Sequence, residues 1–310
     1  MAQYKPHDLT QGVGYQNGEY IPRGDMTMSV HDLGFLMSDM TYDAVKVWKG
    51  KFFRLNDHMD RWDRSIAMRR YNGIPNRQEI TDILFECVRR SGLRESLVYW
   101  IATRGIATDQ RRDLRTCKNT FMAWAGPYNY IVPKAVMDEG KGANLYISSI
   151  QRTPPESVDP TVKSFSRLDF SRALMEAYEH DSDHPILLDG EGYVTEGRGW
   201  NLFALYGSEL VSPDSGVLEG VTRATVLELC GKTNIEGKLG KIKGEELKDA
   251  DEMFMATTAG GIMPITHLNS APVGTGSPGP FTTRIRDLYW EAHDDPRWTT
   301  PVDYDRKAGA

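Results

Sequence analysis

Long apolar runs, closely spaced cysteines and blocks of basic residues are all missing from this sequence of 310 residues. No stretch approaches the ~20 apolar residues of a membrane-spanning helix, and the first residues lack the apolar segment of a secretory signal. The three cysteines, Cys87, Cys117 and Cys230, are odd in number and lack metal-ligand spacing. We therefore expect free thiols in a reducing cytoplasm, with no metal site and no membrane association.

Charge and glycine patterns exclude further classes. The net charge is −6 without a basic block, which argues against a nucleic-acid partner. No Gly-x-Gly-x-x-Gly opens a βαβ unit, so a dinucleotide-binding fold has no support. With 40% hydrophobic and 26% charged residues, a chain of 310 residues has room for two domains of ~100–200 residues.

Periodicity predicts strands and helices in close alternation along the first part of the chain. Residues 39–48 and 52–54 are expected to form a strand and a short returning strand. Leu55, Met59 and Trp62 lie on one face of a helix for which Asn56 or Asp57 can provide the N-cap. A second amphipathic helix is expected to span residues 80–92, followed by strands over 97–103 and 120–124.

The segment 127–140 is rich in proline and glycine at its ends, which is typical of a linker. We therefore predict a small N-terminal domain over residues 1–127, a linker over 128–140 and a larger domain over 141–310. Hairpins outnumber βαβ patterns throughout, which favours the α+β class. Between the strands over 97–103 and 120–124, the polar and basic segment 104–115 is expected to form a mobile loop.

Four short motifs of the second domain carry candidate chemistry. They are Asp159-Pro-Thr-Val-Lys163, Thr195-Glu196-Gly-Arg-Gly-Trp-Asn201, Gly220-Val221-Thr222 and Thr257-Thr258-Ala-Gly-Gly261. Alone, each has an ordinary interpretation as a solvated lysine, an exposed turn or a tight Gly/Thr turn. Together they provide a lysine, a carboxylate and two turns of the kind that bind phosphate.

This combination resembles the pyridoxal 5'-phosphate (PLP) transaminases of fold type IV, and most of all their (R)-selective amine transaminases. Further matches are Arg152-Thr-Pro-Pro and Pro301-Val-Asp-Tyr304, so the resemblance runs from about Ile21 to Tyr304. It implies a two-domain fold with the cofactor in the interdomain cleft. It also implies a homodimer with active sites near the dimer interface, acting on small amines and 2-oxo acids.

The resemblance assigns roles to individual cofactor-binding residues. Lys163 matches the catalytic lysine that holds PLP covalently and shuttles a proton, and Glu196 matches the carboxylate at the pyridine nitrogen. The last residue of Phe53-Arg-Leu-Asn-Asp-His-Met-Asp-Arg61 matches the phosphate-binding arginine. The residues that complete the cofactor site by resemblance are Leu218 against the ring, and Val221, Thr222, Thr257 and Thr258 around the phosphate.

The substrate-binding positions implied by the family are Met37, Tyr42, Leu97, Tyr99 and Trp200, and here the sequence departs from the (R)-amine pattern. That group usually has His at Met37, and Phe and Glu at Leu97 and Tyr99. Arg167 and Arg198 are additional cations near the motifs, suited to a second acidic group of a substrate or to bracing the fold. The Tyr-x-Arg of branched-chain and the Arg-x-His of D-amino-acid transaminases are both missing at residues 97–99.

A loop arginine that binds the carboxylate of pyruvate is a further feature of the (R)-amine group. Alignment places it at Gln110, one residue before Arg111, so Arg111 is the first candidate and Arg112 the second. The other interpretation is a solvated basic loop. We expect a PLP-dependent aminotransferase that uses an (R)-amine or D-configured donor. The alternatives are a branched-chain or D-amino-acid transaminase, a PLP lyase such as an aminodeoxychorismate lyase, and a binding module without activity.

Overall fold

The computed structural model describes residues 9–110 and 112–306, which form two compact units, each built on its own sheet. The mixed helix-and-strand class predicted from the sequence is confirmed. Among the described residues, no helix combines the length and the apolar character needed to cross a bilayer.

The division into units is not linear in the sequence. Unit 1 contains the chain up to Asn129, then Lys163–Phe165 and the stretch that begins at Pro296. Unit 2 contains Tyr130–Val162 and Ser166–Asp295. The division predicted from the sequence differs from this one, because two later segments return to unit 1.

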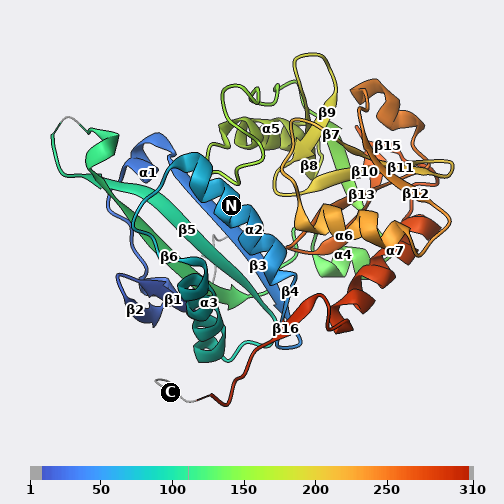
Figure 1. Cartoon of the computed structure of the whole chain (residues 1–310). Coiled ribbons are helices and arrows are strands. Elements are labelled where there is room, and N and C mark those ends of the chain that lie inside the picture. The colour runs from blue at the N-terminus through green and yellow to red at the C-terminus, as the bar shows by residue number, and fades with distance from the viewer. Residues whose placement is uncertain (1–8, 111, 307–310) are drawn as a thin grey trace, which may run out of the picture. The chain divides into compact units, whose positions relative to one another are not determined.

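Unit 1 is built on a seven-stranded antiparallel sheet with the order β16-β4-β3-β5-β6-β1-β2 (Figure 1). Its elements are β1 (Val13–Gln16), β2 (Glu19–Pro22), η1 (Arg23–Asp25), α1 (Leu33–Met37), β3 (Met40–Trp48), β4 (Lys51–Phe53), α2 (Leu55–Arg69), α3 (Arg77–Ser91), β5 (Ser96–Ala107), η2 (Leu114–Thr116), β6 (Cys117–Pro127) and β16 (Thr299–Pro301).

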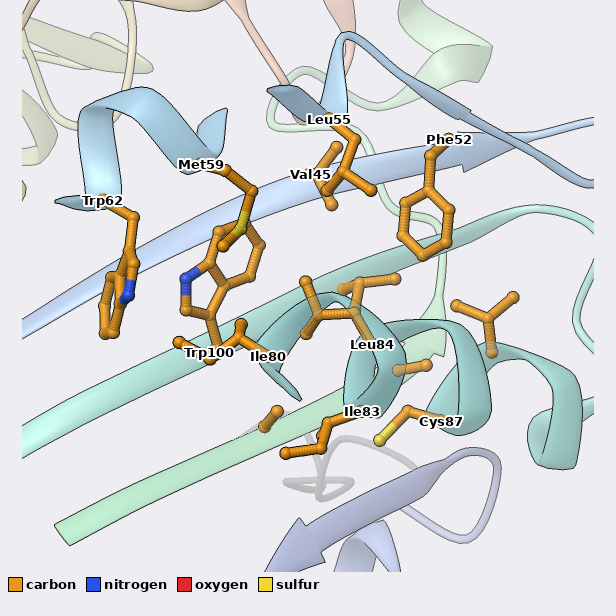
Figure 2. Close-up of a cluster of buried hydrophobic side chains, with 14 of the residues drawn as sticks. Val45, Phe52, Leu55, Met59, Trp62, Ile80, Ile83, Leu84, Cys87 and Trp100 are labelled. Carbon is orange, nitrogen blue, oxygen red and sulfur yellow. The ribbon is translucent and has the colours of Figure 1, made fainter. Parts of the chain in front are cut away.

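One face of this sheet forms the core of unit 1 with α2 and α3. Side chains alternate along a strand, so Val45 and Val47 of β3 both point to this face. Figure 2 shows Val45 beside the apolar stripes of the two helices. The labelled residues of this cluster are Val45, Phe52, Leu55, Met59, Trp62, Ile80, Ile83, Leu84, Cys87 and Trp100. Each large side chain buried here contributes about 1.5–3 kcal/mol, so the periodicity seen in the sequence decides which helix faces pack.

Helix α2 begins without the polar cap predicted from the sequence. Its N-cap is Arg54, which has a φ of 54° and makes no side-chain cap, whereas Asn56 and Asp57 lie inside the first turn. The prediction of Asn56 or Asp57 as N-cap is therefore wrong. The reason is that the chain turns from β4 directly into α2, where the amide of Arg54 donates to the carbonyl oxygen of Trp298 at 2.6 Å.

The second predicted helix, α3, starts earlier than its apolar stripe indicates. Asn76 caps it by accepting from the amides of Gln78 and Glu79, and the Glu79 side chain accepts from Asn76 in return. This capping box satisfies amides that would otherwise lack partners. The helix ends at Gly92 in the left-handed conformation, with a φ of 68°.

The predicted loop over residues 104–115 is shorter in the structure. Strand β5 continues to Ala107, and η2 covers Leu114–Thr116 just before β6. The register between β5 and β6 shifts between Thr103 and Ile106, at Gly105, whose φ is 78°. A Cβ at Gly105 would lie 1.8 Å from the carbonyl oxygen of Lys118, so only glycine fits here.

Unit 2 is built on a mixed sheet of nine strands with the order β12-β11-β10-β13-β14-β7-β8-β9 and with β15 paired to β14. Its elements are α4 (Lys134–Asp138), β7 (Ala143–Ile147), α5 (Leu168–Glu179), β8 (His184–Leu188), β9 (Val194–Gly197), β10 (Asn201–Tyr206), β11 (Glu209–Pro213), α6 (Val221–Cys230), β12 (Glu236–Gly240), η3 (Gly244–Asp249), β13 (Glu252–Thr257), β14 (Gly261–Leu268), β15 (Ala271–Pro272), α7 (Pro280–Glu291) and η4 (Ala292–Asp294).

Two of the three cysteines lie in apolar surroundings. Cys87 and Cys230 are buried, and all three thiols are free. Burial raises the pKa of Cys87 to about 12 and that of Cys230 to about 11, which disfavours the reactive thiolate. These two cysteines therefore behave as small apolar residues.

Candidate active site

Lys163 is held against β3 in unit 1 by its backbone. The amide of Tyr42 and the hydroxyl of Thr41 both donate to the Lys163 carbonyl oxygen at 3.0 Å. The amide of Phe165 donates to the Met40 carbonyl oxygen at 3.4 Å. Lys163 Nζ lies 4.7 Å from the centroid of the Tyr42 ring. The backbone is thus fixed while the amine reaches over an aromatic surface.

The sheet face that carries Tyr42 is lined by rows of cross-strand neighbours from β3, β5 and β6. Residues directly opposite one another in antiparallel strands point to the same face. The rows are Tyr42, Ile101 and Met122, then Ala44, Tyr99 and Trp124, then Lys46, Leu97 and Gly126. Three of the predicted substrate-binding residues therefore share this face. Met37, another predicted substrate-binding residue, is the last residue of α1 and is exposed.

Aromatic contacts dominate the face near Lys163. The rings of Tyr42 and Phe165 lie 4.7 Å apart, and those of Tyr99 and Trp124 stack at 5.0 Å with an angle of 13°. Lys46 is fully buried, with Nζ 5.4 Å from the centroid of the Phe53 ring. Burial lowers the pKa of Lys46 well below its ordinary value. The face is therefore apolar and favours a neutral amine at Lys46.

On the opposite face of β3, Arg61 is part of a buried charged cluster. Its Nε and Nη2 donate to the two oxygens of Asp43 at 2.8 and 2.7 Å, and His58 Nδ1 lies 2.9 Å from Asp43 Oδ1. Burial would raise the pKa of Asp43, but the charge of Arg61 and the hydrogen bond of His58 outweigh it and hold this pKa well below its usual range. Burial lowers the pKa of His58 although Asp43 opposes this effect.

The loop arginines are only partly within the described chain. Arg111 lies outside the described residues. Arg112 is exposed, with a φ of 58°, and Arg115 is exposed and pairs with Asp113 at 2.5 Å. The assignment of a carboxylate-binding arginine to this loop therefore stays a prediction.

In unit 2, Glu196 lies at the end of β9 and is buried. The amide of Leu218 donates to Glu196 Oε2 at 2.9 Å, and Arg152 Nη2 donates to Oε1 at 3.4 Å. Asn201 Nδ2 donates to the carbonyl oxygen of Leu218 at 3.0 Å and lies 3.5 Å from Glu196 Oε2. The carboxylate and the backbone of Leu218 are thus locked together, which fixes two of the predicted cofactor-binding residues in one geometry.

The N-terminus of α6 provides backbone amides for an anion. Val221 and Thr222 are its first residues. The N-cap is Gly220, which has no side chain that could accept a hydrogen bond from the amides of the first turn. The first amides of a helix have no intrahelical partner and lie at the positive end of the helix dipole. A Cβ at Gly220 would lie 2.0 Å from Asn201 Oδ1, so this turn depends on glycine. A phosphate fits the chemistry of these donors.

The turn between β13 and β14 contains the other predicted phosphate-binding residues. Thr257 is buried, and its hydroxyl donates to the carbonyl oxygen of Gly199 at 2.8 Å. The half-buried Thr258 follows, and Gly260 and Gly261 have φ values of 129° and 74°. Thr257 therefore ties this turn to the loop after Glu196, and the phosphate-binding role of Thr258 stays a prediction.

Trp200 lies in the apolar core of unit 2 and is 2% exposed. A Cβ at Gly197 would lie 2.0 Å from its ring, so the indole packs directly on the end of β9. Within the described chain its Nε1 has no hydrogen-bond partner. The assignment of Trp200 to the substrate pocket stays a prediction. In the structure its indole packs against β9, the strand that carries Glu196.

Sequence reasoning missed the partners of the site residues. Asp43, His58 and Asp169 were given no role, although His58 is part of the motif quoted for Arg61. A charged residue in the interior of an apolar strand is the signal that could have identified Asp43. Arg152 was noted as part of a family motif, but its contact with Glu196 depends on the fold.

Unit 1 thus carries a lysine with a fixed backbone, and unit 2 carries a buried carboxylate and the amides of a helix N-terminus, each of which suits a phosphorylated nitrogen heterocycle. Comparison with known proteins agrees, because the family model described as Amino-transferase class IV matches residues 40–268. The chain therefore belongs to the class IV aminotransferases.

Individual relatives cover nearly the whole chain. A protein of Methanocaldococcus jannaschii with the provisional name branched-chain-amino-acid aminotransferase is 28% identical over 278 residues, which are 89% of this chain and 94% of the relative. A D-alanine aminotransferase of Listeria monocytogenes serotype 1/2a is 25% identical over 280 residues, again 89% and 94%. A branched-chain amino acid aminotransferase from the organism abbreviated T.th., solved with N-(5'-phosphopyridoxyl)-L-glutamate, has a TM-score of 0.87 at 28% identity and covers 96% of this chain and 100% of its own.

These comparisons confirm the predictions of fold, enzyme class and cofactor. The fold is that of the fold type IV aminotransferases, and the enzyme is a PLP-dependent aminotransferase. Taken one by one, the groups described above suit this cofactor chemically, since Lys163 offers an amine, Glu196 a buried carboxylate and the N-terminus of α6 backbone amides.

Proposed function

We propose that the enzyme transfers an amino group from an (R)-amine or a D-configured amino donor to a 2-oxo acid such as pyruvate. The observation that carries this proposal is the apolar sheet face around Lys163, built from Tyr42, Phe165 and the Tyr99–Trp124 stack. A donor that carries an aromatic or alkyl group in place of a carboxylate matches such a face. The buried Leu97, where branched-chain and D-amino-acid transaminases have polar motifs, supports the same conclusion.

The catalytic roles follow from the side chains. When bound, PLP supplies an electron sink for the negative charge that develops on the substrate carbon. Nζ of Lys163 would hold the cofactor covalently in the resting enzyme. Once the donor amine has displaced it, the freed Nζ would take up the proton of the donor carbon that bears the nitrogen. Glu196 keeps the pyridine nitrogen protonated, and Leu218 packs on the ring. Holding these groups in fixed positions lowers the barrier because no reorganisation is needed during the reaction.

We propose that a charged side chain, backbone amides and a hydroxyl together bind the phosphate. We assign it to Arg61, to the amides of Val221 and Thr222, and to the hydroxyl of Thr258, with Thr257 bracing the turn. Arginine suits this role because its planar fork matches two phosphate oxygens. These assignments rest on the family resemblance, residue by residue.

A donor panel tests the choice of substrate. The (R)- and (S)-enantiomers of 1-phenylethylamine are offered with pyruvate, and D-alanine and L-leucine with 2-oxoglutarate, while alanine or glutamate formation is measured by chromatography. Preference for the (R)-amine or for D-alanine supports the proposal. Turnover of L-leucine alone would identify a branched-chain transaminase instead, and the absence of amino transfer from every donor would contradict the proposal. The Lys163→Ala variant is the control in each reaction.

We also propose that the enzyme is a homodimer. Support comes from α5, where the apolar side chains Leu168, Met175 and Tyr178 are 74%, 61% and 55% exposed. They are spaced by seven and three residues and so form one stripe on the helix surface. Light scattering after gel filtration measures the mass, and a mass of one chain would contradict this proposal.

A further inference from the structure

Arg152 lies between two buried carboxylates of unit 2, and its hydrogen bond to Asp169 is much shorter than its hydrogen bond to Glu196. Its Nη1 donates to Asp169 Oδ2 at 2.5 Å, whereas its Nη2 donates to Glu196 Oε1 at the longer distance of 3.4 Å. All three side chains are less than a tenth exposed. The ring of Phe170 lies 4.5 Å from the guanidinium carbon. Solvent therefore screens this cluster little, and the difference between the two contacts matters electrostatically.

Asp169 is fixed in the position from which it holds Arg152. Its Oδ2 also accepts from the amide of Thr153 at 3.0 Å, and its Oδ1 accepts from the amide of Phe170 at 2.8 Å. Burial would raise the pKa of Asp169, but the amide of Thr153 and the charge of Arg152 outweigh it and lower this pKa. Asp169 is thus a stable anion at neutral pH.

The surroundings of Glu196 contain charges of both signs. Asp169 and Glu196 carry two negative charges and Arg152 carries one positive charge, while Arg167 is a second cation beside the cluster, 5.3 Å from the centroid of the Phe170 ring. Arg223 on α6 is a further cation that interacts with Glu196 electrostatically, but its Nη1 donates to the carbonyl oxygen of Pro213 at 2.8 Å and it also interacts with Glu219 and Asp214. Leu218 and Asn201 are neutral contacts of Glu196.

We infer that Asp169 is a positioning residue. It keeps Glu196 basic because it forms the closer ion pair with Arg152, so that the cation interacts less strongly with Glu196. This inference rests on the proposed role of Glu196 at the pyridine nitrogen. A carboxylate in a close pair with arginine becomes a weaker base, because the cation favours its ionised form. The short contact with Asp169 lets Arg152 orient Glu196 Oε1 without neutralising it. The negative charge of Glu196 then remains available to stabilise a proton on the ring nitrogen.

The two neighbours of Glu196 are therefore expected to act in opposite directions. Asp169→Asn removes one negative charge and releases Arg152 toward Glu196, so the pH at which the ring nitrogen loses its proton should fall by about one unit or more. Arg152→Met removes the cation and should raise this pH. Arg152→Lys keeps the charge and should restore most of the wild-type value. A purely structural role of the pair would not shift the midpoint in opposite directions.

The ring nitrogen can be observed directly by NMR. Each variant is loaded with pyridoxamine 5'-phosphate labelled with ¹⁵N at the ring, and the chemical shift is followed between about pH 5 and pH 10, where a ring proton of raised pKa would titrate. Asp39→Asn is the matched control, since it removes an ion pair with Arg104 (2.6 Å) in unit 1. Its midpoint should equal that of the wild type.

The outcomes separate the inference from the function on which it rests. If Glu196→Gln leaves the ring signal unchanged, Glu196 does not contact the ring nitrogen, and the proposed role fails together with the inference. If Glu196→Gln lowers the midpoint while Asp169→Asn leaves or raises it, only the inference is overturned. Asp169→Asn changes a single oxygen and is the informative variant even if Arg152→Met does not fold.

Discussion

Replacing Arg61 by alanine should weaken both the fold of unit 1 and the binding of the cofactor, for two separable reasons. The first is structural, because Arg61 makes two of the hydrogen bonds of Asp43, a carboxylate that is 1% exposed. Removing one partner of a buried ion pair typically costs ~3–5 kcal/mol, since the other charge stays buried. The second is the loss of a charge-assisted phosphate contact, worth ~1.5–3 kcal/mol.

Asp43→Asn separates the two effects. It removes the carboxylate and keeps the guanidinium, so the fold should lose stability while the dissociation constant of PLP changes little. Arg61→Ala should lose stability and also raise that constant by about one to two orders of magnitude, at ~1.4 kcal/mol for each tenfold change. The double variant should recover part of the stability lost in Arg61→Ala, because no buried charge is left without its partner.

Unfolding in urea and titration with PLP are the two assays. Tryptophan fluorescence reports mainly on unit 1, which holds Trp48, Trp62, Trp100, Trp124 and Trp298 of the seven tryptophans. Quenching of the same signal by added PLP gives the dissociation constant. The reasoning is refuted if Arg61→Ala unfolds like the wild type. It is also refuted in its second part if Asp43→Asn weakens PLP binding as much as Arg61→Ala does.

The same cluster makes stability depend on pH. The pKa of Asp43 is depressed in the fold, so its contribution is complete above the unfolded value of about 3.9 and is lost as the pH falls below it. The pKa of His58 is lowered by burial, so the fold also loses stability as the pH falls through the unfolded value of about 6.5. Acidification should therefore weaken unit 1 in two stages. In Arg61→Ala the carboxylate stage should shrink, because the folded-state pKa of Asp43 rises toward its unfolded value once the cation is gone.

The remaining predictions concern single side chains. Lys163→Ala should abolish the covalent PLP adduct that borohydride reduction fixes, and peptide mapping of the wild type to another lysine would disprove the assignment. Arg111→Ala should raise the KM for pyruvate strongly and leave the KM for an uncharged amine nearly unchanged. Arg115→Ala on the same loop is the control, and equal effects on both substrates would contradict the prediction. Lys46→Met should raise the free energy of unfolding at pH 7 by about 1–3 kcal/mol, because it removes a buried polar group. Since the pKa of Lys46 is lowered in the fold, this gain should shrink as the pH rises toward about 10.4, and a loss of stability at pH 7 would refute it.

Helices with a regular spacing of apolar residues could be predicted from the sequence, whereas the short connection between β4 and α2 could not. Helices α2 and α3 could be predicted from their apolar stripes, because burial of these side chains is the main source of stability of the two helices. The start of α2 does not, because Arg54 adopts a left-handed conformation that is stabilised by a backbone contact with Trp298. That partner is 244 residues away in the sequence. Propensities carry no information about such a contact.

The candidate site shows the same division. Motifs located Lys163, Glu196 and the turns, since each lies in a short stretch with a distinctive pattern. They did not predict that Lys163 pairs with β3, because its hydrogen bond from Thr41 joins residues 122 positions apart. Nor did they reveal that Arg61 and Arg152 are each bound by an aspartate, since those pairings arise only when strands and helices pack.

The two arginine–aspartate pairs have a common physical consequence. An arginine buried alone in the free chain would carry a large desolvation cost, and its side chain would have to be ordered when the cofactor binds. Asp43 and Asp169 offset the first cost and remove the second, because each fixes the guanidinium in advance. In unit 2 the pairing has a further effect under the inference above, because Asp169 forms the closer ion pair with Arg152 and so lets Glu196 stay basic. The shared role of the two aspartates is therefore to order their arginines in the free enzyme, before any cofactor binds.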